Sequence, residues 1–148
     1  MKRIILEGTD AVGKSTARTL LREVGIAVED RSREYISKYM LFDVDMPTRV
    51  EKYEEFFRNN DVLVIFMVNF DADEIMRRVY SRERVSEFDK RANEYNELYY
   101  NTYLYMMERG IATDSLFLAD CTSLTREQTL ACLKDIIEKH GKQKKKPR

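Results

Sequence analysis

Residues 8–16 read Gly8-Thr9-Asp10-Ala11-Val12-Gly13-Lys14-Ser15-Thr16 and follow the apolar run Ile4-Ile5-Leu6 after a single residue, Glu7. This stretch matches G-x-x-x-x-G-K-[ST] at every fixed position. In this pattern the glycines keep side chains away from backbone N–H groups that converge on phosphate oxygens. The lysine reaches the β- and γ-phosphates, and the first hydroxyl is a ligand to Mg²⁺. We therefore expect residues 8–16 to bind ATP and Mg²⁺, with Lys14 on the phosphates and Ser15 on the metal.

The surrounding sequence supplies the strand and the helix that such a loop requires. Residues 2–7 have the character of a first strand, and residues 14–24 carry apolar side chains at helical spacing until Gly25 ends the pattern. A glycine-rich turn can also be a simple connection between a strand and a helix. The order of strand, loop and helix favours a phosphate site over that alternative.

The distribution of charge divides the chain into a body and a tail. The 148 residues hold 26 basic and 26 acidic side chains, but six of the basic ones lie in the last ten residues. We therefore predict one mildly acidic domain over residues 1–138 and a basic, disordered tail over residues 139–148. A solvated tail and a tail that contacts nucleic acid both fit this composition.

Composition argues against several classes of protein. Two cysteines, Cys121 and Cys132, are too few for a disulfide framework or a cysteine metal site. The longest apolar run, residues 62–68, is far shorter than the ~18 residues of a membrane span, and no secretory signal is recognisable. The only histidine, His140, falls in the predicted tail, so positioned charges fit better than imidazole catalysis. We expect a cytoplasmic protein without a membrane partner.

Strands and helices are expected to alternate along the rest of the chain. A short second strand over residues 26–28 ends at Glu29-Asp30, and an unbroken apolar run predicts a central strand over residues 62–68. Helix starts are predicted near Ser32, at Pro47, after Asp71 and after Thr125. One long helix is expected over residues 87–109 and a last strand over residues 116–119. This order predicts an α/β fold with a parallel sheet of about four strands flanked by helices.

Two further groups of side chains are expected near the glycine-rich loop. Since a right-handed crossover makes the first two strands parallel, Asp30-Arg31-Ser32-Arg33 emerges beside residues 8–16. After the helix that starts at Asp71 the chain turns basic, with Arg77, Arg78, Arg82, Arg84 and Arg91. This arginine-rich segment suits either contact with a phosphoryl group or a solvated charged face. The tyrosines of the long helix suit core packing or an interface with a second copy of the chain.

Residues 6–16 closely resemble the opening of thymidylate kinases, which reads roughly E-G-x-D-G-A-G-K-S-T. Asp30-Arg31 is similar to the D-R pair of that family, and Tyr39 falls where those enzymes carry a tyrosine. The strand at residues 62–68, the helix after Asp71 and a lid at residues 78–84 also look like their counterparts. The resemblance implies a three-layer P-loop kinase fold with an arginine-rich lid and the strand order 2-1-3-4.

The resemblance also implies roles for individual residues. Asp10 would approach the sugar of the acceptor nucleotide, Arg31 would grip the acceptor phosphate, and Asp30 would support Mg²⁺. Tyr39 would belong to the acceptor site. Lid arginines would neutralise the transferring phosphoryl group, which a guanidinium can contact through two hydrogen bonds. The candidates for that role are Arg78, Arg82 and Arg84.

The sequence departs from the thymidylate kinase pattern and leaves the acceptor open. Only fifteen residues separate Lys14 from Asp30, where that family has an extra strand and helices, and Met40 replaces a glutamine. A kinase that transfers phosphate from ATP to a nucleoside monophosphate is the leading hypothesis. In a second hypothesis, the phosphate acceptor is a hydroxyl group of a nucleoside, a modified base or a polynucleotide end. Asp30 would then be the general base and Arg33 would clamp phosphate, a spacing similar to 5′-polynucleotide kinases. The third hypothesis is a nucleotide-binding module without catalytic activity.

Overall fold

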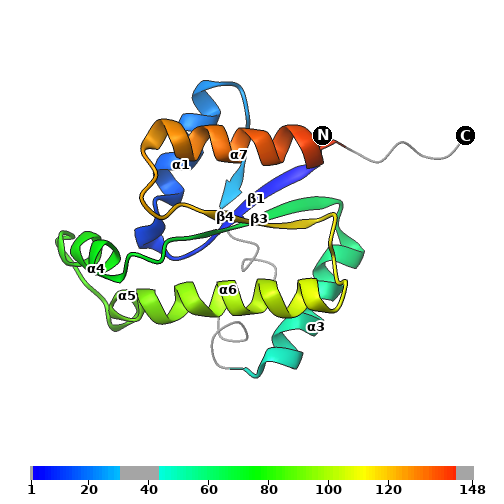
Figure 1. Ribbon diagram of the computed structural model, residues 1–148, viewed down its shortest axis with the longest axis horizontal. Coiled ribbons are helices and arrows are strands. Elements are labelled where there is room, and N and C mark those ends of the chain that lie inside the picture. Colours follow the sequence, from blue (N-terminus) through cyan, green and yellow to red (C-terminus); the bar gives the residue numbers. More distant parts are fainter. Residues whose placement is uncertain (1, 31–43, 143–148) are drawn as a thin grey trace, which may run out of the picture.

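The computed structural model describes residues 2–30 and 44–142, and its centre is a parallel β-sheet (Figure 1). Its four strands are β1 (Arg3–Glu7), β2 (Glu29–Asp30), β3 (Val62–Val68) and β4 (Leu116–Asp120). They lie in the order β2-β1-β3-β4, which is the predicted order. The strand β3 pairs with β1 and with β4, and all of its residues are buried.

Helices cover both faces of the sheet (Figure 1). The helices α1 (Lys14–Glu23) and α7 (Arg126–His140) lie on one face, and α3 (Met46–Asn59) and α6 (Ala92–Glu108) lie on the other. The side chains of β3 alternate between the two cores: Leu63, Ile65 and Met67 pack toward α1 and α7, while Val64 and Phe66 pack toward α3 and α6. A strand covered on both faces therefore needs the continuous apolar run that the sequence shows.

The remaining helical segments of the described residues lie near the C-terminal ends of the strands. They are a short 3₁₀ turn, η1 (Asp10–Val12), the helix α4 (Ala72–Tyr80) and the four-residue helix α5 (Glu87–Lys90). Ala11 of η1 packs with Ile75 and Val79 of α4. The loop after β1 is therefore fastened to the helix that follows β3.

Two predicted helix starts are confirmed by their capping hydrogen bonds. The Asp71 carboxylate accepts from the backbone N–H of Glu74 at 3.0 Å. The Thr125 hydroxyl accepts from the N–H of Gln128 at 3.1 Å, and the Gln128 side chain accepts from the N–H of Thr125 at 2.9 Å. Such reciprocal bonds satisfy amide donors that lack partners within the helix.

Several predicted boundaries were wrong. The second strand forms only at Glu29–Asp30 and not over residues 26–28. The helix α3 begins at Met46, one residue before Pro47, because the side chain of Asp45 caps it through the N–H of Thr48 at 2.8 Å. The helix expected near Ser32 lies outside the described residues.

The long helix expected over residues 87–109 is divided into α5 and α6 at Arg91. Ser86 and Asp89 exchange two hydrogen bonds of 3.0 Å that start α5, and the backbone of Arg91 is not helical. At the other end of the chain, α7 continues to His140, past the boundary placed at residue 138. The His140 ring stacks on Phe117 at 4.0 Å, so it belongs to the folded body and not to a tail.

Candidate functional site

The glycine-rich loop lies at the edge of the sheet where the strands end. Residues 8–13 connect β1 to α1, and the segments that follow β3 and β4 leave the same edge because the strands are parallel. In open α/β sheets, this carboxyl edge is where ligands bind. The structure therefore brings residues 8–16, the start of α7 and the arginine-rich segment (residues 77–91) to one end of the molecule.

The two glycines of the loop are required for different reasons. A Cβ atom at Gly8 would lie 2.6 Å from the carbonyl oxygen of Met67 on β3, which leaves no room for any side chain. At Gly13 space is available, but the backbone has a φ of 95°, in the left-handed region that favours glycine. The first glycine thus lets the loop pass close to the central strand, and the second turns the chain into α1.

Lys14 is folded back over the loop. It is buried, with 3% of its surface exposed, and its Nζ donates to the carbonyl oxygen of Gly8 at 3.1 Å. The next two residues, Ser15 and Thr16, are exposed on the first turn of α1. No side chain in the described residues caps this helix, because Gly13 occupies the N-cap position. The start of a helix, with its backbone N–H groups and a nearby ammonium group, suits an anion.

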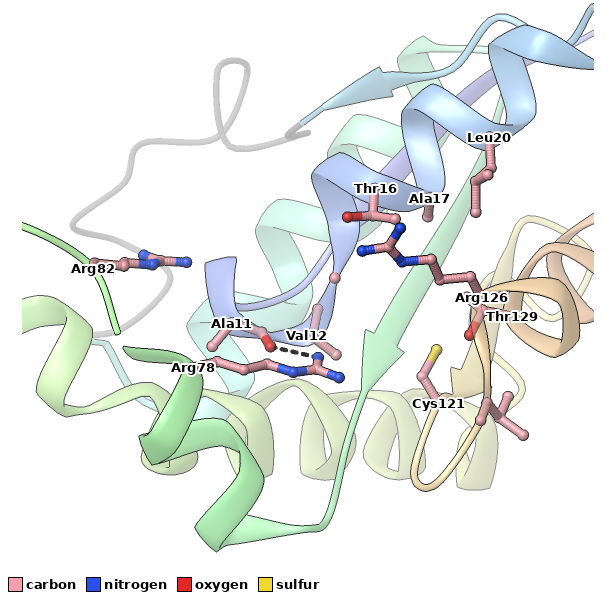
Figure 2. A pocket seen from close by; sticks show the side chains of 12 residues that line it. Ala11, Val12, Thr16, Ala17, Leu20, Arg78, Arg82, Cys121, Arg126 and Thr129 are labelled. Atoms are coloured by element: carbon pink, nitrogen blue, oxygen red, sulfur yellow. Dashed lines mark hydrogen bonds between the residues drawn. The ribbon is translucent and has the colours of Figure 1, made fainter. Parts of the chain in front are cut away.

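A cavity of about 280 Å³ lies beside this loop, between α1, α4 and the start of α7 (Figure 2). Three arginines, Arg78, Arg82 and Arg126, contribute to its wall. The other lining residues are mostly small or apolar: Ala11, Val12, Gly13, Thr16, Ala17, Leu20, Cys121, Leu124 and Thr129. The cavity therefore combines small and apolar side chains with cationic groups near the loop.

The three candidate lid arginines have different surroundings in the structure. Arg78 Nη1 donates to the carbonyl oxygen of Ala11 in the loop at 3.0 Å. Arg82 lies 3.5 Å from the carboxylate of Asp89 and also lines the cavity. Arg84 is exposed and is not part of the cavity wall. The arginine with direct contact to the loop is therefore Arg78.

Arg126 was missed as a candidate by the sequence analysis. It is the first residue of α7, directly after the cap at Thr125, and its side chain extends across the cavity (Figure 2). The signal was present in the sequence: a basic residue that follows a capped helix start, next to a strand whose end reaches the ligand-binding edge.

Cys121 lines the same cavity but is not a reactive group. It is 6% exposed, and burial raises the pKa of its thiol to about 12, with smaller contributions from Cys132 and Asp120. Because the thiolate is the nucleophilic form, a thiol that stays protonated is inert at neutral pH. Cys121 therefore contributes shape to the cavity and not chemistry.

The residues predicted for the acceptor side are only partly described. The backbones of Asp10 and Asp30 are placed: Asp10 starts η1, and Asp30 ends β2 and pairs with Leu6 of β1. The end of β2 therefore lies beside the strand that leads into the loop, as predicted. Arg31, Arg33 and Tyr39 lie outside the described residues. Within the described ranges, no group of three or more His, Cys, Asp or Glu side chains could hold a metal ion.

A buried polar cluster lies under the loop on the α3 and α6 face of the sheet. Glu7 is 1% exposed and accepts a hydrogen bond from the Tyr53 hydroxyl at 3.0 Å. Burial, and then the charge of Glu7, raises the pKa of Tyr53 well above its ordinary value, so the phenol remains the donor. Nearby, Arg49 is 4% exposed, donates to the carbonyl oxygen of Val44 at 3.0 Å, and has its pKa lowered by burial.

The sequence analysis did not identify this cluster as functional. The available signal was Arg49, a charged residue on the apolar face of α3, one turn before Tyr53. A charge at a core position of a helix is uncommon and usually has a specific partner.

Comparison with known proteins gives no family assignment. No model of a known protein family matches the chain, and no curated protein is significantly similar to it. Across the part of the chain that the structure describes, none of the helices combines the length and the apolar character needed to cross a bilayer.

Proposed function

We propose that this chain is an ATP-dependent phosphotransferase, a nucleoside monophosphate kinase of the thymidylate kinase type. One observation carries the proposal: buried Lys14 lies in a glycine-rich loop at a helix start, beside a cavity walled by Arg78 and Arg126. Each part has a role with a polyphosphate, since backbone amides, an ammonium group and guanidinium groups are all donors to phosphate oxygens. A simple strand-to-helix connection would require neither the buried lysine nor the cationic wall.

The donor ATP would extend from the loop into the cavity. Its β- and γ-phosphates would lie on the amides at the start of α1, within reach of Lys14. A volume of about 280 Å³ is near the lower limit for a ligand pocket and suits a nucleobase with its phosphates outside, on the loop. The apolar wall formed by Leu20, Leu124 and Ala17 would contact the base.

In the transfer step, the bond between the γ-phosphorus and the β,γ-bridging oxygen breaks, and a bond to a phosphate oxygen of the acceptor forms. The products are ADP and a nucleoside diphosphate. Negative charge spreads over the oxygens of the transferring group, so fixed cations stabilise the transition state. Lys14 and Arg78 are the cations that the structure holds against the loop.

Mg²⁺ would be held by the hydroxyl of Ser15 and the carboxylate of Asp30, which are the hard oxygen donors that this ion prefers. Ser15 is exposed on the first turn of α1, as a ligand shared with a nucleotide must be. When bound, the ion neutralises charge on the β- and γ-phosphates. Two protein ligands suffice, because Mg²⁺ keeps water and phosphate oxygens in its other positions. The missing cluster of three ligands among the described residues therefore does not conflict with this assignment.

Transfer of label from [γ-³²P]ATP tests this proposal. The purified chain is incubated with Mg²⁺ and, separately, nucleosides, nucleoside monophosphates and DNA with a 5′-hydroxyl end. The test variant is Lys14→Ala, and the matched control is Arg22→Ala, which removes an exposed cation from the other end of α1.

The proposal predicts label on a nucleoside monophosphate, lost in Lys14→Ala and kept in Arg22→Ala. Label on a nucleoside or on DNA instead would replace the proposed acceptor with a hydroxyl group. No transfer to any acceptor would refute the assignment as a kinase.

A further inference from the structure

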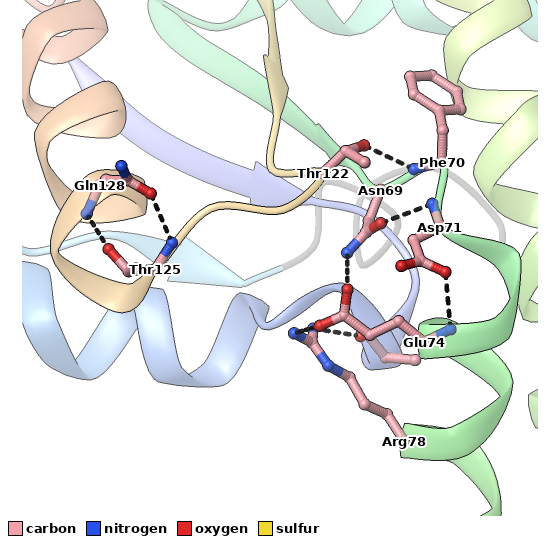
Figure 3. A network of polar contacts seen from close by, with 9 residues as sticks. Asn69, Phe70, Asp71, Glu74, Arg78, Thr122, Thr125 and Gln128 are labelled. Carbon is pink, nitrogen blue, oxygen red and sulfur yellow. Dashed lines mark hydrogen bonds and ion pairs between the residues drawn. The ribbon is translucent and has the colours of Figure 1, made fainter.

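Arg78 is held in place by a chain of hydrogen bonds that runs through Glu74 and Asn69 (Figure 3). Its Nη1 donates to the carbonyl oxygen of Ala11, and its Nη2 donates to Glu74 Oε1 at 2.5 Å. Glu74 lies one helical turn earlier on α4, so both residues occupy the same face. The guanidinium therefore has one anchor in the loop and one on its own helix.

The carboxylate of Glu74 is itself fixed from the other side. Its Oε2 accepts from Asn69 Nδ2 at 3.4 Å. Asn69 directly follows β3, is 2% exposed, and is tied at two further atoms: its backbone N–H donates to Asn96 Oδ1 and its Oδ1 accepts from the N–H of Asp71, both at 2.9 Å. The chain from Asn96 through Asn69 and Glu74 to Arg78 thus links α6 and β3 to the loop.

We propose that Glu74 is a positioning residue that sets the Arg78 guanidinium against the loop before a nucleotide binds. This inference rests on the proposed function, in which Arg78 contacts the phosphates of ATP. Arginine loses considerable rotamer freedom when it is ordered, and an arginine that is already ordered loses less on binding. Glu74 therefore increases the affinity for nucleotide although it does not contact it.

The same ion pair could also have the opposite effect on nucleotide binding, and an experiment distinguishes the two effects. A carboxylate paired with an arginine can withhold that arginine from a phosphate. In the structure, however, Arg78 Nη1 reaches the loop while Nη2 stays on Glu74, so the pair directs the guanidinium toward the site. Arg78 Nη1 also lies 3.8 Å from the position that a Cβ atom on Gly13 would occupy.

The test variant is Glu74→Gln, which keeps the shape of the side chain and an oxygen for hydrogen bonding but removes the charge. Its matched control is Asp73→Asn, because Asp73 is an exposed acid in the same first turn of α4. The same comparison is made between Arg78→Ala and Arg77→Ala, since Arg77 is an exposed neighbour on the same helix. For each variant, the Kd for MgATP is measured by calorimetry, and kcat and KM are measured by phosphate transfer.

We expect Glu74→Gln to weaken MgATP binding and to lower kcat/KM, each about tenfold, the scale of one charge-assisted hydrogen bond. Asp73→Asn and Arg77→Ala should behave like the wild type. In the Arg78→Ala background, Glu74→Gln should cause no further loss, because its effect passes through Arg78. A purely structural role would give the same loss in both backgrounds.

Tighter or unchanged MgATP binding in Glu74→Gln would overturn the positioning role, as would an equal loss in the Arg78→Ala background. These results differ from a failure of the proposed function, in which the wild-type chain itself would neither bind MgATP nor transfer phosphate. That outcome would refute both the proposed function and the role of Glu74, because Arg78 would then have no nucleotide to contact.

Discussion

Replacement of Gly8 by alanine should destabilise the fold, because the new Cβ would lie 2.6 Å from the carbonyl oxygen of Met67 and 3.1 Å from Val12 Cγ1. The carbonyl belongs to β3, the central strand, which is paired on both sides and cannot shift without breaking its ladder. Overpacking in a rigid core costs about 1–3 kcal/mol. The φ of 155° at Gly8 adds about 1 kcal/mol for any other residue.

We therefore expect Gly8→Ala to lower the free energy of unfolding by about 2–4 kcal/mol. For a chain of this length, 1 kcal/mol shifts the melting temperature by about 2–4 °C, so the total shift is about 5–15 °C. Urea denaturation followed by circular dichroism measures the free energy, and a thermal scan measures the shift.

Gly25→Ala is the matched control for this experiment. Its φ is 83°, but a Cβ there would meet nothing within 4 Å, so only the backbone contribution of about 1 kcal/mol remains. If Gly8→Ala destabilised the protein no more than Gly25→Ala, the close passage of the loop over β3 would be refuted.

Two other predictions concern buried groups near the site. Tyr53→Phe removes a hydrogen bond to the buried Glu7 carboxylate and should lower the free energy of unfolding by about 1–3 kcal/mol, measured by urea denaturation. An unchanged value would contradict the role of this hydrogen bond. The pKa of Cys121, raised to about 12, keeps its thiol protonated in the folded state. Since an unfolded thiol ionises above pH ~8.5, the unfolded state then binds fewer protons and stability falls as pH rises from there toward 12. Cys121→Ser should reduce this loss between pH 8 and pH 10, and an identical pH dependence in the variant would argue against the shift.

The sequence was sufficient for the central strand and for two helix starts because their signals are local and strong. The run from Val62 to Val68 is apolar without alternation, which only a strand covered on both faces explains. The caps at Asp71 and Thr125 depend on side chains three residues apart and are therefore visible in the sequence. The strand order followed from the family resemblance and agrees with the structure.

Other features were not visible in the pattern of apolar residues. The helical periodicity continues through Arg91, where the backbone leaves the helical conformation between α5 and α6. Similarly, Gly8 was interpreted as making room for phosphate, but its steric requirement comes from Met67, which is far away in the sequence.

The candidate site was predicted in part. The loop, Lys14 and Arg78 come together, because motif and topology determine their positions. The choice among the arginines required the structure, since only their contacts distinguish Arg78 from Arg84. Glu74 was not among the candidates from the sequence. Its ion pair with Arg78 lies within α4, but the contact of Arg78 with Ala11, which gives the pair its place beside the loop, is tertiary.

The relative affinity for ATP and AMP, measured by calorimetry with Mg²⁺, tests the central claim most directly. If residues 8–16 hold the β- and γ-phosphates, ATP should bind at least about tenfold more tightly than AMP, because each lost charge-assisted contact costs about 1.5–3 kcal/mol. This preference should be about tenfold smaller in Lys14→Ala, the scale of one charge-assisted contact, and should be unchanged in Arg22→Ala. Equal affinity for ATP and AMP in the wild-type chain, or no binding of either, would contradict the assignment of the loop as a phosphate site.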